Sequence, residues 1–166
     1  RARSSLPDEI RAWTGDDVVD LWARFVGTLG SGPLTLLHGD AHIGNTYVLP
    51  DDSVGFLDWQ VVRRGNWSQD VGYFLQGALT VEDRRAHDRE LIEAYVDVIG
   101  LVSAEEAWLR YRASAVYGLA IWLSTLCTDG YQTPEVSLAL AERYATAVVD
   151  LDAVAALVVL ESGALA

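Results

Sequence analysis

The sequence predicts an α+β protein that is mainly helical and contains one small β-hairpin. Three observations lead to this fold class. Most of the chain after residue 67 carries apolar residues at helical spacing. Residues 46–49 and 54–57 are short strand-like runs, and the residues between them, 50–53, are turn formers. No repeat or low-complexity linker divides the sequence, so we expect one domain over residues 1–166.

Composition limits the functions that this chain can have. Of the 166 residues, 51% are apolar, which is enough for a buried core. The 24 acidic residues against 12 basic ones give a formal charge of -12. Such a charge repels nucleic acids and anionic membranes and attracts cationic small molecules. The alternative interpretation is that most of these charges form a solvated surface that aids solubility.

The lone cysteine, Cys127, lies in an apolar helical run, where we expect it to be buried and inert. No internal disulfide can form, which fits a reducing cytoplasm. No signal peptide is visible, and the longest apolar run, 113–127, is shorter than the roughly 20 residues that a membrane span needs. We therefore expect a cytoplasmic protein. Because the first residue is not Met, we also expect a fragment of a longer chain.

The first predicted helix covers residues 16–29 and follows a polar lead. Thr14, with Asp17 three residues later, resembles a capping box at its start. Glycine, serine and proline at 30–33 end it. Residues 34–37 then form an apolar run that predicts a short buried strand leading into the next loop.

The predicted hairpin brings two oxygen-bearing side chains together. If Leu49 faces Val54 across the turn at 50–53, the same pairing places Asn45 opposite Asp58 at the open end. Opposed residues of an antiparallel pair lie about 4.5 to 5.5 Å apart at Cα. An amide oxygen and a carboxylate at that distance suit magnesium, which takes one or two protein ligands beside substrate phosphates. The hairpin is therefore predicted to hold a metal ion.

The segment after the hairpin is predicted to be a loop over 61–67, followed by a helix from Ser68, acting as its cap, to Ala78. Arg63 and Arg64 in the loop either contact phosphate or offset the carboxylates around them. Asp70 lies in the first turn of the helix, where the helix dipole alone favours a negative charge.

Helices account for the remaining sequence. Thr80 begins one that Gly100 ends, and Ser103 begins another that continues to residue 126. Thr133, followed by proline, starts the next, and a separate short helix is expected after Asp150 or Asp152.

The stretch from 36 to 60 carries the chemistry. Asp40 lies on an irregular loop before the hairpin, where its carboxylate can accept a proton. His38, Asp40 and Asn45 stand at the spacing His-x-Asp-x-x-x-x-Asn, and Asp58 takes the place of the aspartate that opens the magnesium-binding triplet of kinases. With glycine after His38 and a second histidine at His42, the stretch resembles the aminoglycoside phosphotransferase and choline kinase family.

This resemblance implies a role for each matching residue. Asp40 would be the catalytic base, Asn45 and Asp58 would hold Mg²⁺ and with it the nucleotide, and Asp70 would brace the catalytic loop. His38 would support the loop from below by bonding to backbone. The donor would be ATP or GTP, and the acceptor a hydroxyl of a small, cationic, aminoglycoside-like or choline-like molecule.

The resemblance also implies that the chain is the C-terminal lobe of a protein-kinase-like fold. Phosphoryl transfer of this type needs a glycine-rich loop and a strand lysine in a preceding lobe. The sequence contains no lysine and too little before Leu34 to form such a lobe. We therefore expect the chain to be nearly inactive alone.

Two alternatives remain open from the sequence. The chain could be a non-catalytic binding or assembly module, with a homodimer formed through the face that the missing lobe leaves open. His38, Asp40 and His42 could instead bind zinc, although the third histidine, His87, lies far away in a polar helical stretch.

Overall fold

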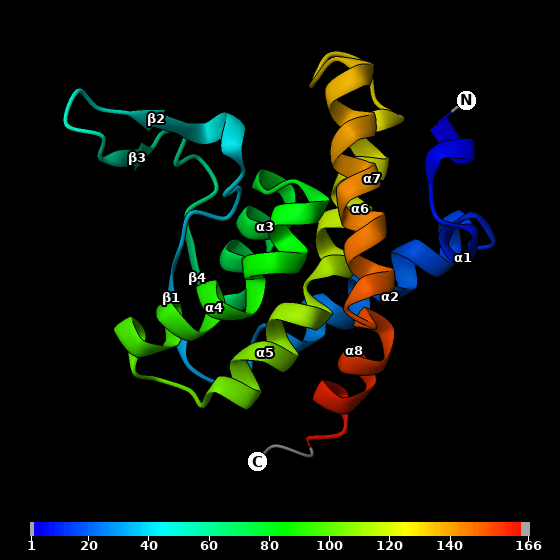
Figure 1. Cartoon of the computed structure of the whole chain (residues 1–166). Helices are drawn as coiled ribbons and strands as arrows, with labels where there is room; N and C mark the ends of the chain where they lie inside the picture. Colours follow the sequence, from blue (N-terminus) through cyan, green and yellow to red (C-terminus); the bar gives the residue numbers. More distant parts are fainter. Residues whose placement is uncertain (1, 164–166) are drawn as a thin grey trace.

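The computed structural model describes residues 2–163 and is mainly helical, as the sequence predicts, but it has two small antiparallel sheets where one hairpin was expected (Figure 1). The helices are α1 (Asp8–Arg11), α2 (Gly15–Thr28), α3 (Ser68–Ala78), α4 (Val81–Ile99), α5 (Ala104–Ala113), α6 (Ala115–Leu126), α7 (Pro134–Asp150) and α8 (Ala153–Glu161), with 3-10 turns η1 (Ala2–Ser5) and η2 (Ile43–Asn45). The strands are β1 (Leu34–Leu37), β2 (Thr46–Val48), β3 (Val54–Phe56) and β4 (Arg63–Asn66).

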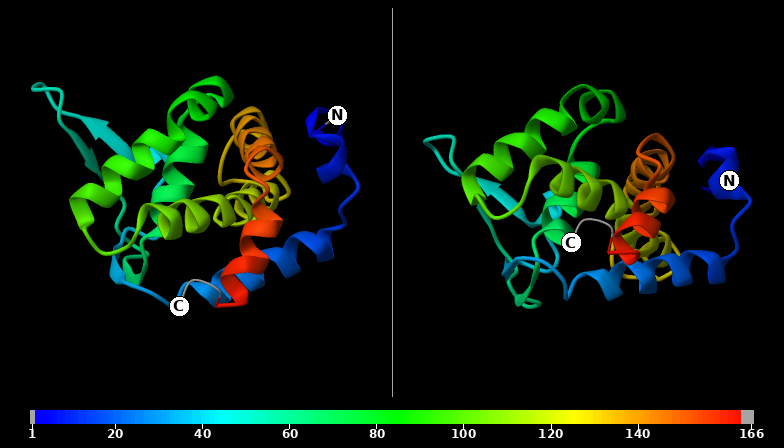
Figure 2. Two further views of the ribbon diagram at one scale, coloured as in Figure 1. Left: turned by 60° about the horizontal axis from the view of Figure 1, so that its bottom comes forward. Right: turned by 90° about the horizontal axis from the view of Figure 1, so that it is seen from below.

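The helices form one body from which the hairpin projects. Helices α6 and α7 lie side by side, α2 crosses α6, and α8 packs on α5. The β2–β3 hairpin extends away from this body in every view, beyond the end of α3 (Figure 2). Among residues 2–163, no helix is both long and apolar enough to cross a membrane.

Local signals set most helix boundaries, as predicted. The Thr14 hydroxyl accepts the N–H of Asp17, and the Asp17 carboxylate accepts the N–H of Thr14, which completes the capping box of α2. Thr80 caps α4, and Gly100 ends it in the left-handed conformation. Thr133 caps α7 ahead of a proline, and α8 follows Asp152.

Two helix predictions were wrong in detail. The helix expected over 103–126 is broken at Ser114, whose hydroxyl donates to the carbonyl of Tyr111 and competes with the helical ladder. Ser68 does not cap α3; it is the first helical residue, and its N–H donates to the side-chain oxygen of Asn66 at 3.0 Å. Tertiary packing of the Asn66 side chain, which is fully buried, therefore decides where α3 begins.

The stretch at 61–67 is not all loop, which corrects the prediction. Residues 63–66 form β4, which pairs with β1 so that Leu34 faces Asn66 and Leu37 faces Arg63. The strand expected to be buried at 34–37 is also mostly exposed: Leu37 is buried, whereas Leu36 is 73% exposed. A two-stranded ribbon has helices against only one face, which explains the alternation.

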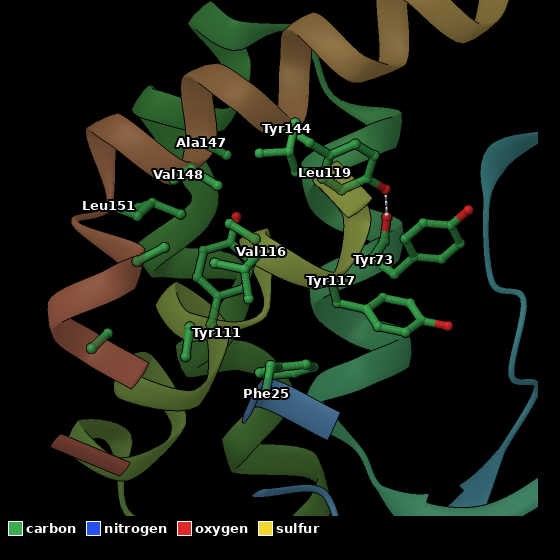
Figure 3. Packing of buried hydrophobic residues seen from close by; sticks show 14 of the residues in the cluster. Phe25, Tyr73, Tyr111, Val116, Tyr117, Leu119, Tyr144, Ala147, Val148 and Leu151 are labelled. Atoms are coloured by element: carbon green, nitrogen blue, oxygen red, sulfur yellow. Dashed lines mark hydrogen bonds between the residues drawn. The ribbon is translucent and has the colours of Figure 1, made fainter. Parts of the chain in front are cut away.

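The core is built by aromatic side chains from several helices (Figure 3). The hydroxyl of Tyr144, on α7, donates to the carbonyl of Tyr73, on α3, and the two rings stack at 5.7 Å. Tyr117, on α6, meets Tyr73 edge-on at 5.6 Å. Tyr73 therefore connects α3 with α6 and α7. In Figure 3 the rings of Tyr73 and Tyr117 are directed toward the segment that leads into the hairpin.

Cys127 is exposed rather than buried, which contradicts the expectation. It follows the last residue of α6, so the helical stripe that predicted burial ends before it is covered. The thiol is free, as a chain with one cysteine requires.

The packing of Tyr144 predicts the effect of a single methyl group. Gly118 lies under the Tyr144 ring, where a Cβ would overlap the ring carbons. We expect Gly118→Ala to destabilise the protein by about 1 to 3 kcal/mol through overpacking, although alanine is the better helix former. Gly27→Ala is the control, because a Cβ at Gly27 meets only open space and should stabilise α2 by about 0.5 to 1 kcal/mol. Urea unfolding measures both changes, and equal effects would contradict this packing.

Candidate active site

The loop after β1 is attached to the helical body by Asp70. The backbone N–H groups of His38 and Gly39 donate to the Asp70 carboxylate at 2.6 and 3.1 Å. Burial raises the pKa of Asp70, and these two bonds oppose that rise. Gly39 has a φ of 88°, a conformation that side chains disfavour, and it turns the chain toward Asp40. Asp70 thus takes the bracing position that the resemblance implies.

His38 joins the loop to the hairpin. Its Nδ1 accepts the N–H of Asp40 at 3.3 Å, so Nε2 carries the hydrogen and donates to the carbonyl of Leu57 at 2.7 Å. Its ring lies 4.7 Å from that of Trp59 and is buried. Both ring nitrogens are therefore used by backbone groups and cannot bind zinc. Within residues 2–163, no group of three or more His, Cys, Asp or Glu side chains is arranged to hold a metal.

Asp40 and Asn45 are in contact. The Asn45 amide nitrogen donates to the Asp40 carbonyl at 3.0 Å and lies 3.4 Å from Oδ2 of the Asp40 carboxylate. In the described part of the chain, no donor bonds to Oδ1 of Asp40, whose side chain is 38% exposed. One carboxylate oxygen thus faces its own loop, and the other is free to accept a proton from a bound molecule.

The hairpin register differs by one residue from the prediction. Val48, not Leu49, pairs with Val54. The N–H of Leu49 donates to the carbonyl of Ser53, so the loop has three residues rather than four. Asp52 ends that loop with a φ of 65°, the left-handed residue that three-residue hairpin loops require. The sequence pattern identified the turn-forming residues 50–53. It could not show that Ser53 pairs with Leu49 and so lies outside the loop.

Asn45 therefore faces Leu57, and Asp58 comes one position later. The N–H of Leu57 donates to the carbonyl of Asn45 at 2.9 Å. Asp58 has a φ of 63°, which changes the direction of the backbone directly after the strand. Burial lowers the pKa of His42, and the negative charges of Asp40 and Asp58 oppose that lowering. The predicted pair is adjacent in the fold, although the two residues are not directly opposed.

The donor set at the open end of the hairpin fits a hard cation. Asn45 uses its amide nitrogen within the loop, and no described residue donates to its Oδ1. Asp58 is exposed and has only a 3.5 Å contact with the Gln60 amide. Asn45 is buried and Asp58 is exposed, so the pair offers one amide and one carboxylate oxygen, the ligand types that magnesium uses when it keeps several waters. Asn45 and Asp58 would hold the ion.

Three aromatic residues below the loop were missed as its neighbours: helical spacing assigned Trp122 to the core, and no position was predicted for Tyr73 or Tyr117. Tyr73 and Trp122 meet the His42 ring edge-on at 6.3 and 5.8 Å. Burial raises the pKa of both Tyr73 and Tyr117, and the negative charge of Asp40 adds to this rise. The sequence signal for this region was a second histidine, His42, two residues after Asp40.

Arg63 and Arg64 are both exposed on β4. Within residues 2–163, neither forms an ion pair with a carboxylate, but the charge of Arg63 lowers the pKa of Asp70. Both alternatives for these arginines, contact with phosphate and offsetting of nearby carboxylates, stay predictions.

A mainly helical body therefore anchors the loop that carries Asp40 and leads through Asn45 into the hairpin. The model of the phosphotransferase enzyme family matches residues 2–113, and the chain belongs to this family. The match includes the catalytic loop, the hairpin and helices up to α5, and it confirms the resemblance read from the sequence. No curated protein and no solved structure matches the chain.

The brace predicts a local loss of order when Asp70 is removed. Asp70→Ala leaves two backbone N–H groups without their acceptor, which costs about 1 to 3 kcal/mol for each buried group. We expect faster hydrogen exchange at the amides of His38 and Gly39, measured by NMR. Asp97→Ala, at an exposed position on α4, is the control and should leave these amides unchanged. Unchanged exchange in Asp70→Ala would show that the loop does not depend on this bond.

Proposed function

We propose that the intact protein transfers the γ-phosphoryl group of ATP or GTP to a hydroxyl of a small, cationic molecule. Membership of the phosphotransferase family supports the reaction class. The observation that carries the proposal is the division of labour at Asp40: Oδ2 faces Asn45, while Oδ1 is open to a ligand. The formal charge of -12 favours a cationic acceptor of the aminoglycoside or choline type.

In this mechanism Asp40 orients the acceptor hydroxyl and takes its proton on Oδ1. The hydroxyl oxygen then forms a bond to the γ-phosphorus, and the bond to the bridging oxygen breaks, so that the nucleoside diphosphate leaves with that electron pair. Mg²⁺ bound by Asn45 and Asp58 would neutralise charge on the phosphates. The protein contributes mainly position and charge, since little covalent chemistry is asked of it.

We further propose that residues 1–166 are the C-terminal lobe of a two-lobed, protein-kinase-like enzyme. The sequence has no lysine to contact the α- and β-phosphates, which this chemistry requires. Exposed apolar side chains support a covering partner, because they gather on β1 and the hairpin: Leu36, Tyr47, Val48, Leu49, Val54, Leu57 and Trp59. We place the enzyme in the cytoplasm, where Cys127 would stay reduced.

Substitution of Asp40 tests the catalytic role. In the protein assayed with its nucleotide-binding lobe, Asp40→Asn should lower kcat by about 10² to 10⁴-fold with little change in KM, because it removes the base but keeps the shape. Phosphoryl transfer from ATP or GTP to an aminoglycoside or choline is followed by ³¹P NMR. Asp97→Asn is the control. Full turnover in Asp40→Asn would contradict the mechanism, and turnover by residues 1–166 alone would contradict the two-lobe proposal.

The same apolar surface favours a second candidate, a non-catalytic assembly module that dimerises through it. Metal binding separates the two functions. We expect Mn²⁺ to broaden the NMR signals of Asn45 and Asp58, and Asp58→Asn to weaken this binding at least about tenfold, since one of the two protein ligands is altered. Asp97→Asn should bind as the wild type does. A wild-type chain that shows no response to Mn²⁺ or Mg²⁺ and sediments as a dimer would favour the module.

A further inference from the structure

His42 is held in one orientation by contacts at both ring nitrogens. The N–H of Gly44 donates to Nδ1 at 3.0 Å, and Nε2 lies 3.7 Å from Oδ2 of Asp40. The His42 side chain is only 15% exposed. Its position is therefore set by the protein and not by solvent.

The contact with Gly44 decides where the imidazole hydrogen lies. A nitrogen that accepts an N–H must present a lone pair, so Nδ1 is unprotonated and the neutral ring carries its hydrogen on Nε2. That Nε2–H faces the Asp40 carboxylate. The neutral His42 ring therefore places its Nε2 3.7 Å from the Asp40 carboxylate, slightly beyond hydrogen-bond length.

The neighbouring residues hold the plane of the ring. Tyr73 and Trp122 both meet it edge-on with an interplanar angle of 85°. Gly44 is needed on the other side, because a Cβ there would overlap the imidazole. The aromatic pair comes from α3 and α6, so the helical body sets the direction of Nε2–H.

We propose that His42 is a positioning residue for the catalytic base. Together with the amide of Asn45, it presents two N–H groups to Oδ2 of Asp40, which leaves Oδ1 as the oxygen that receives the acceptor proton. This inference rests on the proposed function, in which Asp40 is the base.

The lengths of the two contacts suit this role. At 3.4 and 3.7 Å they are longer than a good N–H···O hydrogen bond, so they orient the carboxylate mainly by electrostatic attraction. Two short bonds would stabilise the charged carboxylate strongly and weaken it as a base. Long contacts to Oδ2 orient the Asp40 carboxylate and lower its basicity less than short bonds would.

The tautomer of His42 is the first test, and it does not depend on activity. Long-range ¹H–¹⁵N correlation of the labelled 166-residue chain should show His42 protonated at Nε2 and unprotonated at Nδ1. Asp40→Asn should shift the His42 Nε2 signal and leave that of His87, on exposed α4 surface, unchanged. A His42 ring protonated at Nδ1, or one insensitive to Asp40→Asn, would overturn the proposal.

Two substitutions then separate positioning from loop structure. His42→Asn keeps an acceptor near Nδ1 for the N–H of Gly44 but has no group that reaches Asp40, whereas His42→Gln can place an N–H near the position of Nε2. In the active protein we expect His42→Asn to lower kcat about 10- to 100-fold with unchanged KM and melting temperature. His42→Gln should retain most of kcat.

The alternative is that His42 only caps η2 through Nδ1. Full kcat in His42→Asn would establish this alternative and overturn the proposal, as would loss of kcat in both variants together with a lower melting temperature. A wild type without phosphoryl transfer or metal response would refute the proposed function instead, and the tautomer measurement would still decide whether His42 is directed at Asp40.

Discussion

The site depends on one interaction, the bond between the Asp70 carboxylate and the backbone N–H groups of His38 and Gly39. It is the point at which the irregular loop is fastened to α3. A side chain from a loop without such an anchor would sample many directions, and general-base chemistry requires the base to stay within hydrogen-bond reach of its proton. Burial raises the pKa of Asp70, and the backbone bonds that its oxygens accept oppose that rise.

Helix α3 supports the loop that carries Asp40 through two of its side chains. The same helix that carries Asp70 carries Tyr73, which stacks on Tyr144 and receives the hydrogen bond of its hydroxyl. Tyr73 also meets the ring of His42. Helix α3, packed against α6 and α7, therefore supports the surroundings of Asp40 in two ways. Asp70 holds the loop backbone, and Tyr73 contacts the imidazole of His42. Rigid helices are better supports for such geometry than loops are.

The hairpin carries the two proposed oxygen ligands, and its shape depends on two left-handed residues. Asp52 closes a three-residue turn, and Asp58 redirects the chain where β3 has ended. Non-glycine residues seldom adopt this conformation, and such residues cluster at functional sites. The exposure of Asp58 at this bend, next to the free amide oxygen of Asn45, is consistent with a site that is completed by a ligand.

The sequence by itself determined the features that depend on neighbours along the chain. Helix starts could be predicted because a cap needs only one residue and the N–H groups that follow it. The caps predicted in this way are Thr14 with Asp17, Thr80 and Thr133. The spacing of His38, Asp40 and Asn45 likewise identified the family, because the loop that carries them is short and continuous.

Only the tertiary structure decided what depends on partners far apart in sequence. The pairing of β4 with β1, the exposure of Cys127 and the one-residue shift of the hairpin each follow from a contact that no local pattern records. The contact of His42 with Trp122 joins residues 80 positions apart, so spacing predicted a core tryptophan and said nothing about Asp40. Periodicity reports which face of a helix is buried, but it cannot report which side chain from another element meets that face.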